Sequence, residues 1–184
     1  MPGCPTGYLR VNGTCVPLIQ CPSNQIDSGC SLVCPSNSCL IDGDLVIDGS
    51  ILETPTLSIV SVVTVTGNVS LVNQVTLILS VGGVLNVEGC LLLNDNSRLV
   101  VRVDGEVNNG AILATYTCSS PDLLDRVSIE LNSELDECRD GRAVVEQREN
   151  ASGTKQLELL FVPSDSDACS SGSKVNIVAI SIAV

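Results

Sequence analysis

An apolar pattern that recurs about every 22 residues limits the folds open to this chain. Between residues 41 and 117, Val, Ile and Leu alternate with small polar residues, which is the two-residue period of half-buried strands. Leu57, Leu77 and Leu99 each open such a strand, at steps of 20 and 22 residues. A parallel β-solenoid needs a period of this length, because each coil buries its inner side chains only against neighbouring coils. We therefore predict an all-β chain with three to four solenoid coils.

Shorter repeats within this region share the same step. The segment 81–86 (Val-Gly-Gly-Val-Leu-Asn) returns in similar form at 103–108, and Gly67 and Gly89 are also 22 residues apart, while Gly49 lies 18 residues before Gly67. Glycine and asparagine suit the corners of a coil, where a positive φ is required. An antiparallel β-sandwich is the alternative fold, since its strands also alternate, but it does not require one subsequence to return at a fixed step.

The chain divides into three regions. Residues 1–40 are rich in Cys, Pro, Gly, Asn and Ser and have few apolar residues, which predicts a small module held together by disulfides. Residues 41–117 form the predicted coils. Residues 118–184 lose the strict period, and we expect them to complete or cap the solenoid with further strands.

The C-terminal region carries its own local signals. Ser120 and Pro121 are a typical start for a short helix or turn, with Ser120 as the N-cap residue. Residues 127–131 alternate as a strand. Segments 143–147 and 156–162 flank a polar turn, which predicts a β-hairpin.

Composition excludes several classes of function. The chain has no His, which removes the commonest general base and metal ligand, and its formal net charge is −12. No Lys or Arg occurs between residues 11 and 97. Nucleic-acid binding requires basic side chains that replace the counterions of the phosphates, so we expect no nucleic-acid binding. No run reaches the roughly 18–20 apolar residues of a membrane span. We expect no enzymatic activity and no cofactor.

Ten cysteines and three glycosylation sequons indicate an oxidising, extracellular setting. No C-x-x-C pair occurs, so disulfides explain the cysteines better than zinc does. The six cysteines of the first region alone allow 15 pairings, and the connectivity stays open. The predicted disulfide residues are Cys4, Cys15, Cys21, Cys30, Cys34, Cys39, Cys90, Cys118, Cys138 and Cys169. Candidate N-glycosylation sites are Asn12, Asn68 and Asn150, each followed by Ser or Thr two residues later.

The N-terminal stretch Cys4-Pro5-Thr6-Gly7-Tyr8, followed by Cys15, resembles the opening of EGF-like extracellular modules over about 40 residues. The periodic region resembles the β-helix segments of eukaryotic surface and extracellular-matrix proteins. The chain lacks the C-x-C step usual in EGF-like modules and has Cys30 and Cys34 instead, so no EGF calcium site is carried over.

Two charged clusters are candidate sites. Asp42, Asp44 and Asp48 offer oxygen ligands that suit Ca²⁺, with two solvated turns as the alternative. Arg98 and Arg102 lie near the acidic residues Asp95, Asp104 and Glu106, a set that a polysaccharide-cleaving site would need. Because residues 98, 102, 104 and 106 share one parity, a surface charge ladder is the favoured interpretation.

The resulting expectation is a structural extracellular protein that self-associates. The apolar segment 175–184 predicts a strand that pairs with a neighbouring subunit, with the start of a truncated anchor as the alternative. The candidate assembly residues are Val175, Ile177, Ile180, Ile182 and Val184. The alternative function is an adhesin or binding module with a glycan or protein partner. Aromatic platforms for sugars are scarce, since aromatic residues make up only 2% of the chain.

Overall fold

A computed structural model provides the structure. It describes residues 8–11, 14–17, 19–20, 30–32, 34, 37–50, 56–80, 82–103, 109–131 and 142–162.

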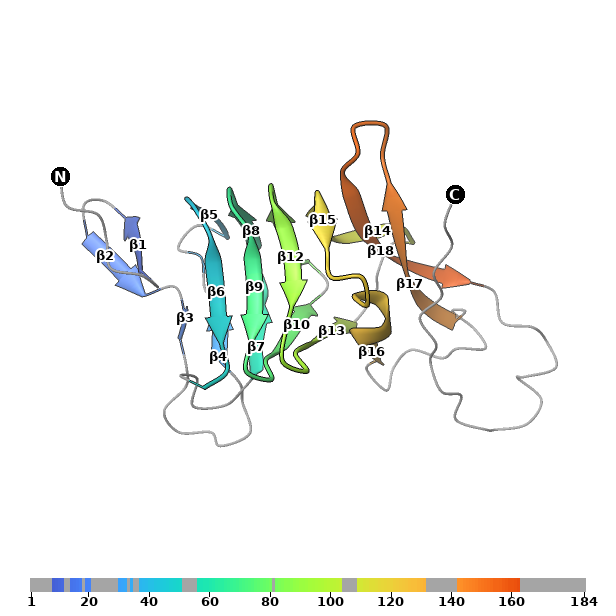
Figure 1. Cartoon of the computed structure of the whole chain (residues 1–184), viewed down its shortest axis with the longest axis horizontal. Helices are drawn as coiled ribbons and strands as arrows, with labels where there is room; N and C mark the ends of the chain where they lie inside the picture. The colour runs from blue at the N-terminus through green and yellow to red at the C-terminus, as the bar shows by residue number, and fades with distance from the viewer. Residues whose placement is uncertain are drawn as a thin grey trace.

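The described chain is nearly all β and forms a parallel β-solenoid of about four turns, with its sheets running along the stack (Figure 1). The first sheet contains the parallel strands β4 (Cys30–Leu32), β7 (Thr56–Ile59), β10 (Thr76–Ser80), β13 (Arg98–Val103) and β16 (Val127–Leu131). The second contains β5 (Ser38–Ile41), β8 (Val62–Val65), β11 (Val84–Val87) and β14 (Ala111–Tyr116). The third contains β6 (Leu45–Asp48), β9 (Val69–Val72), β12 (Cys90–Leu93) and β15 (Cys118–Ser119).

Antiparallel pairs occur at both ends of the described stack. Strands β1 (Tyr8–Val11) and β2 (Thr14–Pro17) form a hairpin, and β3 (Ile19–Gln20) pairs with β4. At the other end β17 (Arg142–Glu149) pairs with β18 (Lys155–Val162), and β18 pairs with β14. The predicted C-terminal hairpin is therefore confirmed, and it closes the second sheet by antiparallel pairing.

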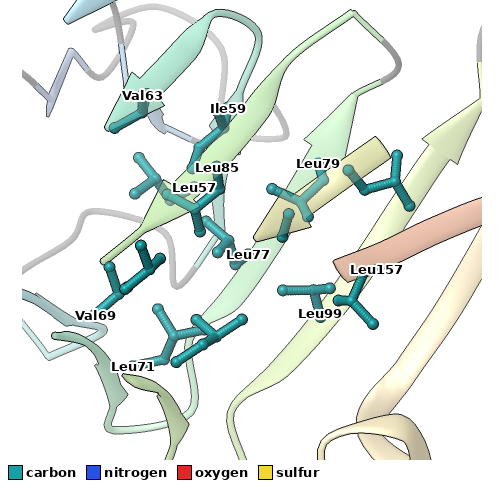
Figure 2. Close-up of a cluster of buried hydrophobic side chains, with 14 of the residues drawn as sticks. Leu57, Ile59, Val63, Val69, Leu71, Leu77, Leu79, Leu85, Leu99 and Leu157 are labelled. Carbon is teal, nitrogen blue, oxygen red and sulfur yellow. The ribbon is translucent and has the colours of Figure 1, made fainter. Parts of the chain in front are cut away.

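Aliphatic columns connect the coils, as the 22-residue step predicted. Leu77 pairs with Leu57 on one side and with Leu99 on the other, and all three side chains are fully buried. Figure 2 shows these residues within one cluster of buried leucine, valine and isoleucine side chains. Strands of successive coils are parallel throughout these columns, so the antiparallel sandwich is excluded as the fold.

Two details of the predicted repeat are wrong. Leu85 pairs with Ala114, a step of 29 residues, so the 22-residue step does not lead to the next strand of this sheet, and residues 104–108 lie outside the described residues. Gly49 donates its N–H to Val72 O at 3.0 Å and thus belongs to a different corner from Gly67. Gly67 and Gly89 do share a corner, since the Gly89 N–H donates to Gly67 O at 3.1 Å.

The boundaries of the coils extend beyond residues 41–117. Strands β4 and β5 begin before residue 41 and pair in parallel with β7 and β8, so the first coil includes part of the segment 1–40. Near the other end, a turn leads into the short 3₁₀-helix η1 (Leu124–Arg126). Its N-cap residue is Leu123, with no side-chain capping bond, so the N-cap prediction for Ser120 is wrong.

Candidate functional site

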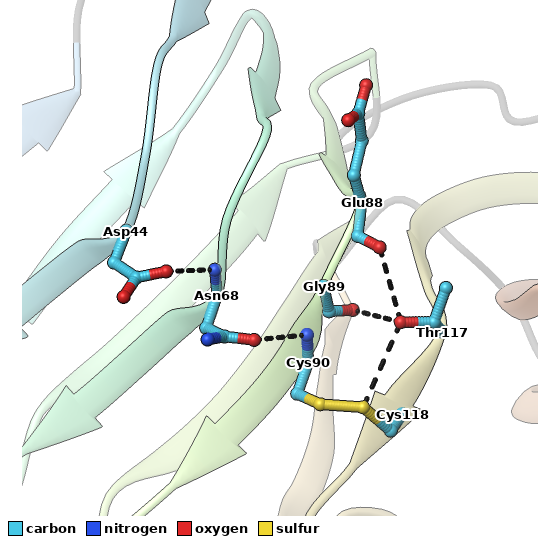
Figure 3. The surroundings of a disulfide bond; sticks show 7 residues. All are labelled: Asp44, Asn68, Glu88, Gly89, Cys90, Thr117 and Cys118. Atoms are coloured by element: carbon cyan, nitrogen blue, oxygen red, sulfur yellow. Dashed lines mark hydrogen bonds between the residues drawn. A yellow bond between two sulfur atoms is a disulfide. The ribbon is translucent and has the colours of Figure 1, made fainter.

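Polar side chains gather at the corner between the second and third sheets. Asp44 Oδ1 accepts a hydrogen bond from Asn68 N–H at 2.7 Å, and Asn68 Oδ1 accepts one from Cys90 N–H at 2.9 Å. One coil further, Thr117 Oγ1 donates to Gly89 O at 2.8 Å (Figure 3). We call Asp44, Asn68, Gly89, Cys90 and Thr117 the first corner ladder. The first two steps satisfy backbone N–H groups of the corner, whereas Gly89 O also accepts a hydrogen bond from Thr117 N–H at 2.9 Å.

Glycine is required in this ladder because the coils approach closely. A Cβ atom added at Gly89 would lie 2.5 Å from Asn68 Oδ1 and 2.7 Å from Gly67 O. A Cβ at Gly67 would overlap Asp44 in the same way. The 22-residue spacing of these two glycines therefore reflects contact between backbones of adjacent coils.

Disulfides tie the described coils. Cys90 and Cys118 are bonded across two coils within the first corner ladder, and Cys34 bonds to Cys39 within the first coil. Cys30 is also disulfide-bonded, and none of the cysteines in the described part is free. Cys15 lies in β2, whereas four predicted disulfide residues lie outside the described residues, namely Cys4, Cys21, Cys138 and Cys169.

A second corner lies after the strands of the third sheet. Asp48 Oδ1 accepts hydrogen bonds from Asn73 Nδ2 at 2.7 Å, Ser50 Oγ at 2.7 Å and Ser50 N–H at 2.8 Å. The bond from Asn73, and then those from Ser50, lower the pKa of the Asp48 carboxyl. Asn73 and Asn96 have φ of 58° and 59°, as expected of asparagine at a corner.

The three calcium candidates do not converge on one point. Asp42 Oδ1 accepts a hydrogen bond from Thr66 Oγ1 at 3.0 Å, and Asp42 and Asp44 precede β6 whereas Asp48 ends it. Across the described residues, no group of three or more His, Cys, Asp or Glu side chains could hold a metal ion. The carboxylates instead bond the next coil, as described for Asp44 and Asp48.

Arg98 and Arg102 make surface contacts along one face of β13. Arg98 Nε donates to Thr76 Oγ1 at 3.2 Å, and Arg102 forms an ion pair of 3.0 Å with Glu130. Both partners come from neighbouring strands of the first sheet. Asp95 lies at the second corner and accepts from Asn73 N–H at 3.5 Å, while Asp104 and Glu106 lie outside the described residues.

A pocket of about 330 Å³ lies where the turn after β15 meets the C-terminal hairpin. Nearby, Tyr116 is fully buried, its hydroxyl donates to Gln147 Oε1 at 2.8 Å, and burial raises its pKa. The pocket was not predicted, because residues far apart in the sequence meet only through the register of the hairpin. It is lined by Ser119, Ser120, Pro121, Leu123, Leu124, Asp125, Gln147 and Lys155.

The sequons have different environments. Asn150 is exposed in the turn between β17 and β18, whereas Asn68 is half-buried in the first corner ladder. Asn12 and the five assembly candidates of segment 175–184 lie outside the described residues.

Among the described residues, no helix is long and apolar enough to cross a membrane.

Comparisons with known proteins identified no relative of this chain. No family model matches the chain, and neither a curated protein nor a solved structure matches it at a significant level.

Proposed function

We propose that this chain is an extracellular structural protein, a glycosylated subunit of a surface coat, matrix or filament. The observation that carries the proposal is that polar corner groups bond neighbouring coils. Asp44, Asn68 and Asp48 each use a side-chain oxygen to accept a hydrogen bond from the next coil. Side-chain oxygens that bond the next coil in this way make the stack of coils more rigid, and this use favours a structural role for them over a catalytic one.

The proposed location follows from the disulfides. The Cys34–Cys39 and Cys90–Cys118 bonds persist in oxidising compartments such as the extracellular space and are rare in the cytosol. The net charge of −12 favours solubility and opposes binding to nucleic acids or anionic membrane surfaces.

Assembly by strand addition has an acceptor at the first coil. Strands β5 and β6 are the last strands of their sheets among the described residues. Their outward side chains Leu40 and Val46 are 57% and 59% exposed, whereas the same columns continue with Thr64 and Ser70 in the next coil. An edge strand with apolar side chains favours pairing with an added strand.

The donor in this proposal is segment 175–184 of a second copy, which gives head-to-tail growth. A heterologous contact of this kind produces open filaments when its rotation does not close a ring. The five apolar residues predicted for assembly would supply the outward and inward faces of the donated strand.

Deletion of residues 175–184 tests the assembly mechanism. Secreted full-length and shortened chains are compared by negative-stain microscopy and by light scattering after size-exclusion chromatography. We expect fibres from the full-length chain and monomers from the shortened one. Fibres from both would refute strand donation by this segment, and a monomeric full-length chain would refute the structural proposal.

Two acceptor substitutions make the test more specific. Leu40→Thr and Val46→Ser give the first coil the residues that Thr64 and Ser70 provide one coil later, so the fold is expected to tolerate them. We expect the double variant to lose assembly while its melting temperature stays unchanged. Val62→Thr, on the outer face of β8 in an inner coil, is the matched control and should still assemble.

A binding module is the second candidate, favoured by the pocket beside the hairpin. Its lining combines hydroxyl, amide, carboxylate and ammonium groups, which can donate to and accept from a polar ligand such as a sugar. A full-length monomer that binds a glycan surface, and loses binding in Gln147→Ala and Lys155→Ala variants, would favour this alternative.

A further inference from the structure

We infer that Asn150 carries an N-linked glycan in the folded protein, and that Asn68 stays unmodified as a structural residue of the first corner ladder. The inference rests on the proposed extracellular function, because sequons are modified in secreted proteins. It separates two sequons that the sequence alone treats as equivalent.

The turn around Asn150 presents its side chain to solvent. Asn150, Ala151, Ser152 and Gly153 are all exposed, and the turn of the β17–β18 hairpin stands clear of the stacked coils (Figure 1). Asn150 Oδ1 accepts hydrogen bonds from Ser152 N–H at 3.0 Å and Thr154 N–H at 2.9 Å. These bonds orient the amide locally, and no described residue accepts a hydrogen bond from its Nδ2.

The modification replaces one hydrogen on that nitrogen. Nδ2 of Asn150 forms a bond to the anomeric carbon of a sugar supplied by a pyrophosphate-linked oligosaccharide donor. The bond between the sugar and the phosphate oxygen breaks, the pyrophosphate leaves, and Nδ2 loses one proton. Oδ1 remains an acceptor, so the turn keeps both of its bonds to Ser152 and Thr154.

Asn68 is held by three neighbours in the coil stack. Its N–H donates to Asp44 Oδ1, its carbonyl oxygen accepts from Leu45 N–H at 2.8 Å, and its Oδ1 accepts from Cys90 N–H. Figure 3 shows its side chain between the corner of the preceding coil and the disulfide of the following one. The closeness of Gly89, whose added Cβ would lie 2.5 Å from Asn68 Oδ1, leaves little room at this corner.

A glycan at Asn68 would therefore compete with closure of the corner. The Asn150 side-chain amide accepts hydrogen bonds from backbone N–H groups of its own turn. The Asn68 side-chain amide instead accepts a hydrogen bond from Cys90 N–H in the next coil. A glycan on Asn68 Nδ2 would leave Oδ1 as an acceptor, so the conflict is steric: the sugar would have to fit where Asp44, Gly89 and Cys90 of the adjacent coils lie close to this amide. We expect chains modified there to fail to stack, and folded secreted molecules to have an unmodified Asn68.

The inference also restricts the proposed assembly. A glycan on the hairpin turn must remain in solvent, so that turn cannot be buried between subunits. The first-coil edge formed by β5 and β6 lies at the opposite end of these sheets from β17, so a glycan on the turn does not obstruct the proposed strand addition there.

Two serine variants test the assignment without changing either asparagine. The full chain is secreted from a eukaryotic host as wild type, Ser152→Ala and Ser70→Ala, and each product is digested after enzymatic deglycosylation in heavy-oxygen water. Deglycosylated asparagine becomes labelled aspartate, so occupancy is read at each site by peptide mass. We expect most wild-type molecules to be labelled at residue 150, none in Ser152→Ala, and none at residue 68 in any of the three.

Labelling at residue 68 in secreted, disulfide-bonded protein, or an unlabelled residue 150, would overturn the inference. A structural role for Asn68 further requires that Asn68→Ala lowers the melting temperature more than Ser70→Ala, which removes the same sequon. The result is independent of assembly: an unlabelled Asn150 in chains that form fibres refutes only the glycan site. A labelled Asn150 in chains that stay monomeric refutes only the structural function.

Discussion

Shortening Leu77 tests whether the aliphatic columns hold the coils together. Leu77 is fully buried and lies in register between Leu57 and Leu99, which are also fully buried. Leu77→Ala removes three carbon groups, and at about 0.8 kcal/mol each the lost transfer free energy is about 2.4 kcal/mol. The strands on both sides are fixed by their ladders about 4.8 Å away, so they cannot collapse into the space. The added cavity cost brings the expected loss to about 4 kcal/mol.

The same change at the end of a column should cost less. Leu45 is 9% exposed and pairs with Val69 on one side only among the described residues. For Leu45→Ala we expect a loss of about 2.5 kcal/mol, because the end of the stack can relax. Ser58→Ala, at an outward position of β7, is the control and should change the free energy of unfolding by less than about 0.5 kcal/mol.

Urea unfolding at equilibrium with intact disulfides measures these differences. The variants are compared at one protein concentration under conditions in which the chain is monomeric. If Leu77→Ala costs less than about 1.5 kcal/mol, or no more than Leu45→Ala, then stacking in columns is not the main source of stability.

Three further predictions concern the corners. Gly89→Ala should destabilise by about 1–3 kcal/mol, because its Cβ would meet Asn68 Oδ1 at 2.5 Å; an unchanged thermal midpoint would contradict this. Replacing Cys90 and Cys118 together by Ala should cost about 3.5 kcal/mol, from opening a loop with a sequence separation of 28; equal urea midpoints for the oxidised wild type and the variant would refute it. Hydrogen bonds lower the pKa of Asp48 in the folded state, so its contribution is present above the unfolded pKa of about 3.9 and is lost as pH falls through the folded pKa. Asp48→Asn should therefore flatten the fall in urea midpoint between about pH 5 and pH 2, and parallel acid slopes would disprove the role of this carboxylate.

The column register could be predicted from the sequence because it depends only on period. Leu57, Leu77 and Leu99 recur where a strand must turn the same face inward, and a slip by one residue would expose the whole strand. The fourth coil could not be placed in this way. Leu85 pairs with Ala114 because the chain inserts extra residues before β14, and a similar subsequence at 103–108 suggested a shorter step.

The corner contacts depend on the direction of each side chain, and the length of the sequence repeat does not predict that direction. Asn68 and Asp44 are 24 residues apart and Asn68 and Cys90 are 22 apart, so their proximity follows from the coil step, but their hydrogen bonds do not. The Cys90–Cys118 bond joins residues 28 apart, which is longer than the 22-residue step. Predicting this pair would have required knowing that the chain inserts extra residues before β14. The 18-residue spacing of Gly49 from Gly67 does not mark a shared corner, because each coil has several corners and glycine occurs at more than one.

Columns and corners have separate roles in specifying the stack. Aliphatic columns supply most of the stabilising free energy, but neighbouring Leu and Val side chains could pack in more than one register. The corner bonds select one register, because Asn68 can reach Cys90 N–H only when the coils are aligned as observed. At one end the β17–β18 hairpin ends the second sheet by antiparallel pairing, so a further parallel coil cannot continue that sheet there. The other end of the second sheet, at β5, has no such antiparallel pairing among the described strands, so the two ends of this sheet differ. In the proposed filament, growth therefore proceeds from the β5–β6 end, where the outward side chains are apolar and the corner groups of the next coil are already in register.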